Sequence, residues 1–399
     1  MRFVFFYPSL VSDWHNDTAH FLRGIATELL ACGHEVSVFE PADGWSLRNL
    51  REQCGDGPIK AFHATCPHLT SALYDPATID LDAVLEDADV VIVHEWSPPL
   101  IIQRIGLHRA TARGYRLLFH DTHRRAVRTE EDLDCCDLSH YDGVLASSAA
   151  LRELYEGSGR TARAWTWHPA VDTRIFRPWP CDPVKAFDLV WAGSWGDGER
   201  STELVEFLVE PVRALGLRAR VYGACYPDEA LRILRRAGID YAGWLPNFCV
   251  PMALATARFT VHIPRRPLGD GLPRSPGTQM LESLACGMPL VSAPLDDWEG
   301  LLEPGEDVLV ARDGKQMQRH LEHLAAEPDF AAAMAERGRA TVLARHTCAH
   351  RAGQLLAICR DLQTGADPTA PQRQLSETVS PPARADYPAR PSGAQPAWH

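Results

Sequence analysis

Short apolar runs alternate with amphipathic stretches along most of the chain. Residues 3–7 form a continuous apolar run, which is typical of a buried parallel strand. Residues 22–30 then place apolar side chains at helical spacing, and Gly33 predicts the end of this helix. Residues 35–39 are the next predicted strand. A strand–helix–strand unit at the start of a chain predicts an open parallel sheet.

The alternation continues and then starts again after a boundary rich in proline. Pro178, Pro180 and Pro183 mark this boundary, so we expect an α/β fold of two Rossmann-like, doubly wound parallel-sheet domains facing a central cleft. The predicted parts are a first domain at 1–168, a connector at 169–186, a second domain at 187–345, a last helix at 346–362 and a tail at 363–399. The tail is rich in Pro, Ala, Ser, Arg and Gln without apolar periodicity, which predicts disorder.

A predicted helix followed at once by a strand, at residues 276–293, carries the strongest candidate chemistry. Gly277 and Thr278 open the helix, so a phosphate can approach its unpaired N–H groups. Glu282 follows about one turn of ~3.6 residues later, where its carboxylate can accept hydrogen bonds from a vicinal diol. A diol next to a diphosphate describes a nucleotide sugar. The alternative is an ordinary packed helix whose Glu282 faces solvent.

A glycine-rich turn follows the first predicted strand of the second half. Gly193 and Ser194 let backbone N–H groups approach a phosphate, and Arg200 adds a positive charge at the start of the next helix. After a later strand, Gly243 and Trp244 are placed to border a base. The alternatives are an ordinary strand-to-helix turn and a tryptophan of the core.

Polar residues end two predicted strands of the first half. His120 and Asp121 end one strand, and His94 and Glu95 end another, at the sheet edge where ligands of parallel sheets bind. A histidine can take a proton from an acceptor hydroxyl, so His120 with Asp121 is the candidate catalytic pair. His94, Glu95 and Asp17 of the first loop are candidates for the acceptor side. The alternative is that these histidines are structural.

Charge and cysteine content narrow the class of protein. The net charge is −12 and the sequence pI is near 5.8, which argues against nucleic acid or an anionic membrane as the main partner. The 11 cysteines are odd in number and include no CxxC, so we expect reduced thiols and a cytoplasmic location. No apolar run reaches the ~20 residues that a membrane span needs.

Metal ligation is not predicted. His120, Asp121 and His123 contain ligand types, as does the segment His63-Ala64-Thr65-Cys66-Pro67-His68. Neither group offers a four-ligand set on regular elements, which structural zinc sites need.

A resemblance to a known family rests on the stretch Glu282-Ser283-Leu284-Ala285-Cys286-Gly287-Met288-Pro289-Leu290-Val291. It resembles the E-A-x-A-x-G-x-P-V signature of GT-B glycosyltransferases, and residues 168–178 resemble the connector between the two halves of these enzymes. The resemblance implies a metal-independent hexosyltransferase-like enzyme of carbohydrate biosynthesis. It also implies that Glu282 binds the donor ribose and that the last helix crosses back onto the first domain. Retaining members carry a second Glu eight residues earlier; this chain has Arg274 there, so we place Arg274 on the sugar side.

Further motifs resemble one branch of this family. Residues 119–123, 193–200 and 310–314 look like the spore-maturation-type (CgeB-like) glycosyltransferases. The expected partners are a nucleoside-diphosphate sugar, as substrate and not as cofactor, and a carbohydrate, lipid-linked or small-molecule acceptor. Alternatives on the same fold are a nucleotide-sugar epimerase, a phosphorylase, and a catalytically degenerate carbohydrate-binding or scaffold protein. A dehydrogenase is disfavoured because the first loop lacks G-x-G-x-x-G.

Overall fold

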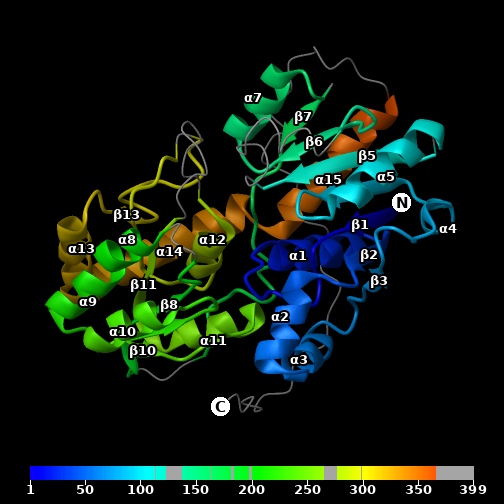
Figure 1. Cartoon of the computed structure of the whole chain (residues 1–399). Helices are drawn as coiled ribbons and strands as arrows, with labels where there is room; N and C mark the ends of the chain where they lie inside the picture. Colours follow the sequence, from blue (N-terminus) through cyan, green and yellow to red (C-terminus); the bar gives the residue numbers. More distant parts are fainter. Residues whose placement is uncertain are drawn as a thin grey trace.

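Two parallel β-sheets organise the chain in the computed structural model. The structure describes residues 1–112, 114–122, 137–161, 163–180, 184–196, 200–264, 276–297 and 299–364. Each sheet lies at the centre of its own α/β domain, and the two domains face each other in Figure 1. This arrangement is the predicted fold class.

The sheet of the first domain has the strand order β3-β2-β1-β4-β5-β6-β7, and all its described pairings are parallel. Its strands are β1 (Arg2–Phe6), β2 (Glu35–Pro41), β3 (Ala72–Tyr74), β4 (Val90–His94), β5 (Arg116–Asp121), β6 (Gly143–Ala146) and β7 (Ala164–Thr166). Its helices are α1 (Thr18–Ala31), α2 (Trp45–Cys54), α3 (Gly57–Thr65), α4 (Leu81–Leu85), α5 (Pro99–Thr111) and α7 (Ala149–Ser158).

The central strand β1 explains why the apolar run at the start of the chain is continuous. Successive side chains of a strand point to opposite faces of its sheet. Phe3 and Phe5 therefore enter the core under α1, while Val4 and Phe6 enter the core on the other face. Because helices cover both faces, every position of the strand beyond Arg2 is buried.

The sheet of the second domain has the order β10-β9-β8-β11-β12-β13 and is also parallel. Its strands are β8 (Phe187–Ala192), β9 (Ala219–Tyr222), β10 (Asp240–Tyr241), β11 (Ala257–His262), β12 (Leu290–Ser292) and β13 (Leu309–Val310). Its helices are α8 (Ser201–Leu204), the π-turn η1 (Val205–Val209), α9 (Glu210–Leu215), α10 (Asp228–Arg236), the 3-10 turn η2 (Asn247–Cys249), α11 (Val250–Ala255), α12 (Thr278–Ala285), α13 (Gly314–Ala326) and α14 (Pro328–Arg345).

Helix α12 and strand β12 form as the sequence predicts. Gly277 occupies the N-cap position, and the helix ends before Gly287, whose φ of 71° is the left-handed conformation that favours glycine. Met280 and Leu284 are fully buried in the core of the second domain. This packing fixes α12 against the sheet and leaves its N-terminal end at the domain boundary.

The last helix, α15 (Cys348–Thr364), packs on the first domain (Figure 1). Its apolar residues join the core beneath α1, and the indole Nε1 of Trp167 donates a hydrogen bond to the Arg351 carbonyl at 3.0 Å. Gly24 of α1 lets the two helices approach closely, because a Cβ there would lie 2.3 Å from the Cys348 sulfur. The chain therefore passes between the domains a second time. The predicted tail lies outside the described residues from residue 365 onward.

Candidate active site

A pocket lies between the two domains, at the carboxyl ends of the strands of the second sheet. It contains about 790 Å³ of space, part of which is open to solvent. Ligands of parallel α/β sheets bind at this edge. The first domain contributes its β1–α1 loop, and the second contributes its strand-end turns and α12. The lining residues are Asp13, His15, Asn16, Asp17, Ala192, Gly193, Ser194, Arg200, Tyr222, Gly223, Ala224, Trp244, Leu245, Asn247, Val250, Thr278, Gln279 and Glu282.

The pocket brings together most of the predicted donor-site residues. Six of them line it, and two more, Gly243 and Gly277, are the chain neighbours of lining residues Trp244 and Thr278. The lining six are Gly193, Ser194, Arg200, Trp244, Thr278 and Glu282, and Asp17, predicted on the acceptor side, lines the pocket as well. Residues far apart in the sequence therefore meet at one surface. Arg274 lies outside the described residues.

Glu282 is the most strongly perturbed acid of the pocket. It is only 5% exposed, and its Oε1 accepts a hydrogen bond from the Asn247 side-chain amide at 2.9 Å. Burial raises the pKa of Glu282 to about 8, and the negative charges of Asp17 and Asp13 act in the same direction. The hydrogen bond from Asn247 opposes this shift, because it favours the ionised carboxylate. The carboxyl group is therefore mostly protonated at neutral pH in the free protein.

The turn after β8 places backbone groups at the pocket wall. A Cβ on Gly193 would lie 2.6 Å from the Trp191 ring, and one on Gly223 would lie 2.0 Å from the Gly193 carbonyl oxygen. Only residues without side chains fit at these two positions. The two glycines therefore let the ends of β8 and β9 pack closely against each other and against Trp191.

Arg200 holds this turn in shape. Its Nε donates to the Ser194 carbonyl at 3.1 Å, and its Nη1 donates to the Ile263 carbonyl at 3.0 Å. The guanidinium also lies 5.3 Å from the centre of the Trp191 ring, and Arg200 is 5% exposed. It thus places positive charge behind the turn, and its described hydrogen bonds go to the main chain.

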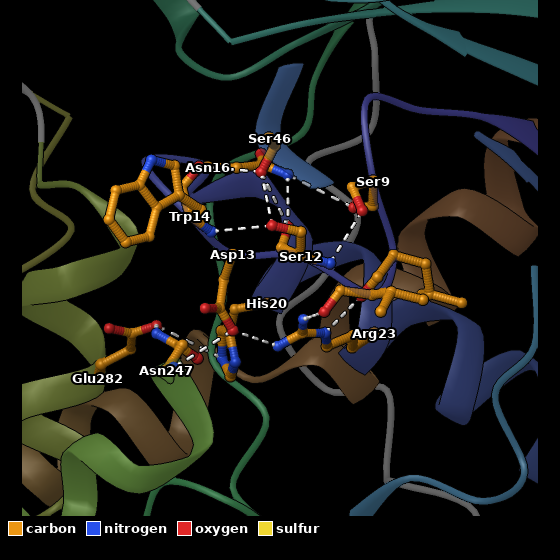
Figure 2. Close-up of polar contacts among 12 residues, drawn as sticks. Ser9, Ser12, Asp13, Trp14, Asn16, His20, Arg23, Ser46, Asn247 and Glu282 are labelled. Atoms are coloured by element: carbon orange, nitrogen blue, oxygen red, sulfur yellow. Dashed lines mark hydrogen bonds and ion pairs between the residues drawn. The ribbon is translucent and has the colours of Figure 1, made fainter. Parts of the chain in front are cut away.

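The β1–α1 loop of the first domain closes the other side of the pocket. His15 Nδ1 lies 3.0 Å from the Ser194 hydroxyl, and the rings of Trp14 and Trp244 are 5.5 Å apart between centroids. Asp13 accepts a hydrogen bond from the Asn247 backbone N–H at 3.2 Å (Figure 2). The loop is therefore in direct contact with the second domain.

The candidate catalytic pair, His120 and Asp121, does not line this pocket. His120 is 2% exposed, its Nδ1 lies 2.7 Å from the Tyr7 hydroxyl, and burial lowers its pKa to about 3. Asp121 accepts a hydrogen bond from the Tyr155 hydroxyl at 2.5 Å. The imidazole of His120 is consequently neutral and packed against Phe21 and Trp167.

His94 and Glu95 also lie away from the pocket lining. His94 Nδ1 accepts a hydrogen bond from the Trp96 backbone N–H at 3.1 Å. Glu95 accepts one from the Thr122 backbone N–H at 2.8 Å and another from the Thr122 hydroxyl. Both residues are fully buried. Their described bonds hold the ends of β4 and β5, and their predicted place on the acceptor side stays a prediction.

Sequence reasoning missed six polar residues of the pocket: Asp13, His15, Asn16, Tyr222, Asn247 and Gln279. Gln279 sits in the first turn of α12 and donates a hydrogen bond to the Ala192 carbonyl. Its position beside Thr278 is a signal that the sequence offered. Asn247 follows Trp244 by three residues, but nothing local indicates its partner Glu282.

Two absences hold for the described residues. Within them, no group of three or more His, Cys, Asp or Glu side chains is placed to hold a metal ion. Within the same ranges, no helix combines the length and apolar character that crossing a membrane requires.

Comparison with known proteins identifies the fold. Residues 200–357 match the family model of glycosyl transferase-like domains. HepE of Anabaena, solved in complex with UDP and glucose, superposes with a TM-score of 0.67 at 15% identity, over 90% of this chain and 99% of HepE. The chain has the GT-B fold. Within it, residues 200–357 are similar to glycosyl transferase-like domains.

Two further structures are similar to the chain over nearly its whole length. Sucrose-phosphate synthase of Thermosynechococcus elongatus has a TM-score of 0.60 at 16% identity, covering 92% of this chain and 100% of its own. A putative UDP-N-acetylglucosamine 2-epimerase of Listeria monocytogenes has a TM-score of 0.56 at 13% identity, covering 92% and 98%. The sequence matches no curated protein. These likenesses establish the GT-B fold and leave the reaction to the chemistry of the site.

Proposed function

We propose that the protein is a glycosyltransferase that moves a sugar from a nucleoside-diphosphate donor to an acceptor. The observation that carries this proposal is the meeting of Glu282, the N-terminal end of α12 and the Gly193–Ser194 turn at one pocket. A carboxylate can accept hydrogen bonds from the two ribose hydroxyls. The N–H groups of the turn and of the helix end are suited to the diphosphate, whose charge grows as the glycosidic bond breaks.

The proposal extends to whether the reaction needs a metal, which kind of acceptor is used and which branch of the family the protein belongs to. We propose that the reaction is metal-independent, because main-chain N–H groups and the Arg200 charge can stabilise the leaving diphosphate. The acceptor is a carbohydrate, a lipid-linked molecule or a small molecule. His120 and Asp121 stay candidates for proton transfer, although they lie outside the pocket lining. Membership of the CgeB-like branch and a cytoplasmic location are proposals from the sequence.

UDP is the first nucleotide to test. HepE, which shares the fold, was solved with UDP and glucose, with UDP alone, and with UDP-glucose. The identity of 15% is too low to transfer the donor, so the base and the sugar are matters for experiment.

A nucleotide-sugar epimerase is the second candidate function. The likeness to the putative UDP-N-acetylglucosamine 2-epimerase favours it as a rival, because the same fold hosts both reactions. Epimerisation needs no acceptor, which separates the two. A phosphorylase would need inorganic phosphate, and a scaffold protein would turn over nothing.

The test is a product assay with nucleotide sugars. The protein is incubated with UDP-glucose, UDP-N-acetylglucosamine and GDP-mannose, with and without a mixture of simple glycosides, and products are followed by NMR. Release of the nucleoside diphosphate that depends on the glycosides, and that is lost in Glu282→Gln, supports the transferase. A new nucleotide sugar formed without acceptor supports the epimerase. Glu229→Gln is the matched control. Glu229 forms an exposed ion pair with Arg232, so this variant should react as wild type.

A further inference from the structure

Asn247 forms hydrogen bonds with one residue of each domain. It lies in the turn η2 of the second domain, and its backbone N–H donates to Asp13 Oδ2 of the first domain at 3.2 Å. Its side-chain Nδ2 donates to Glu282 Oε1 at 2.9 Å. Figure 2 shows Asn247 between the β1–α1 loop and the helix that carries Glu282. Its backbone is thus bonded to the first domain, and its side chain is bonded to Glu282 within the second.

Asp13 is itself held rigidly. Arg23 of α1 donates from Nη1 to Asp13 Oδ2 at 2.7 Å, and both side chains of this ion pair are 6% exposed. The other guanidinium nitrogens donate to the Leu10 carbonyl at 2.7 Å and to the Val11 carbonyl at 2.8 Å. A buried, fully bonded arginine loses little entropy on each further contact, because its planar fork is preorganised. The acceptor that the Asn247 backbone N–H meets is therefore held in place by Arg23 of α1.

His20 is another polar side chain near Glu282, and it cannot take over the role of Asn247. Its Nε2 lies 3.8 Å from Glu282 Oε1 but accepts a hydrogen bond from the Asp172 backbone N–H at 3.2 Å. A nitrogen that accepts this bond carries no proton to donate. Burial lowers the pKa of His20 to about 4, so the ring is neutral. Among the described residues, Asn247 is the side chain that donates a hydrogen bond to the Glu282 carboxylate.

We propose that Asn247 is a positioning residue, which holds the Glu282 carboxylate in the orientation that receives the donor ribose. This inference rests on the proposed function, because it assigns a role within the same donor site. Asn247 keeps one carboxylate oxygen bonded, so that the remaining lone pairs of Glu282 face the ligand. The titratable groups around Glu282 are Asp13, Asp17 and His20 from the first domain and Cys286 on its own helix.

The test compares Asn247→Ala and the nearly isosteric Asn247→Asp with wild type. A hydrogen bond to a charged group is lost in both, so we expect UDP to bind about tenfold more weakly to Asn247→Ala at pH 7. Asn247→Asp should weaken binding further, because it also places a carboxylate against Glu282. Asn49→Ala is the matched control: the Asn49 amide donates to the Trp45 carbonyl in α2, and Asn49 does not line the pocket. It should bind UDP as wild type.

A second readout separates positioning from a merely structural role and needs no nucleotide. The protein is labelled with ¹³C at the glutamate carboxyl carbons, and the Glu282 signal is assigned by its loss in Glu282→Gln. Asn247→Ala should move the midpoint of this titration upward, since the lost bond favours the ionised form. Asn49→Ala should leave it unchanged.

The outcomes distinguish this inference from the proposed function. An unchanged Glu282 titration in both Asn247 variants would overturn the positioning role, whatever nucleotides bind. An upward shift together with weaker UDP binding supports it. In a third outcome, the Glu282 titration shifts upward in Asn247→Ala, but the wild-type protein binds no nucleoside diphosphate. The contact between Asn247 and Glu282 would then hold, while the donor site, and with it the role proposed for Asn247, would be refuted.

Discussion

The buried carboxyl of Glu282 predicts that nucleotide binding depends on pH in an unusual range. Burial and the nearby charges of Asp17 and Asp13 raise its pKa to about 8 in the free protein. Two ribose hydroxyls donate hydrogen bonds best to an ionised carboxylate, so binding should require loss of this proton. Affinity should therefore increase as pH rises toward and through the raised pKa.

The magnitude follows from the fraction of ionised Glu282. With a pKa of about 8, about one tenth of the carboxyl groups are ionised at pH 7 and about nine tenths at pH 9. Binding to the ionised form alone then gives a Kd about tenfold lower at pH 9 than at pH 7. About 0.9 proton should be released per nucleotide bound at pH 7. The second ionisation of a phosphate is near pH ~6, so the ligand adds little in this range.

Calorimetry measures both quantities. UDP is titrated at pH 7, 8 and 9, and at pH 7 in two buffers of different ionisation enthalpy, whose difference in heat gives the proton release. Glu282→Gln cannot ionise at this position and should bind weakly with a flat pH profile. Glu229→Gln should keep the wild-type slope. A Kd that is constant in pH, or that rises toward pH 9, would refute the argument that ribose meets an ionised Glu282.

Three further perturbations follow from the structure. The pKa of Glu282 is raised on folding, so the stability of the free protein should fall as pH rises from about 4.5 to about 8. The Tm of Glu282→Gln relative to wild type should therefore increase over this range. A Tm difference that stays constant with pH would contradict the raised pKa. Gly24→Ala should cost ~1–3 kcal/mol of stability, because its Cβ would lie 2.3 Å from the Cys348 sulfur. Adding Cys348→Ala should restore part of that loss in denaturant unfolding, and additive losses would show that the two helices do not meet there. Hydrogen bonding to His168 at 2.7 Å lowers the pKa of Glu299, so Glu299→Gln should lower Tm at pH 7, with the difference fading as pH falls below 4.5; a difference that persists in acid would mean that the ion pair is not its cause.

The fold and part of the pocket lining could be predicted from local sequence. The apolar run of β1, the helix stop at Gly287 and the glycines after β8 each have a local physical meaning, and each stands where it was expected. The helices and the strand between residues 45 and 74 were not predicted. The exposed face of α2 is mainly polar, and β3 is only three residues long, so neither leaves a clear periodic signal.

Long-range contacts were beyond the sequence. Asn247 reaches Glu282 across 35 positions and Asp13 across 234, so no spacing rule connects them. His120 was correctly placed at the end of a strand, but a strand-end side chain can point to either face of its sheet. The packing of Phe21 and Trp167 against its ring decides that His120 is buried, and this packing depends on the return of α15 to the first domain.

The most direct test of the account is a binding panel of UDP, GDP, dTDP, ADP and NAD on wild type and Glu282→Ala by calorimetry. The account predicts that one nucleoside diphosphate binds and that Glu282→Ala loses ~1.5–3 kcal/mol of that binding, the range for a hydrogen bond to a charged group. NAD should not bind. No binding by any nucleoside diphosphate, or equal affinity in a folded Glu282→Ala variant, would contradict the claim that this pocket holds the donor.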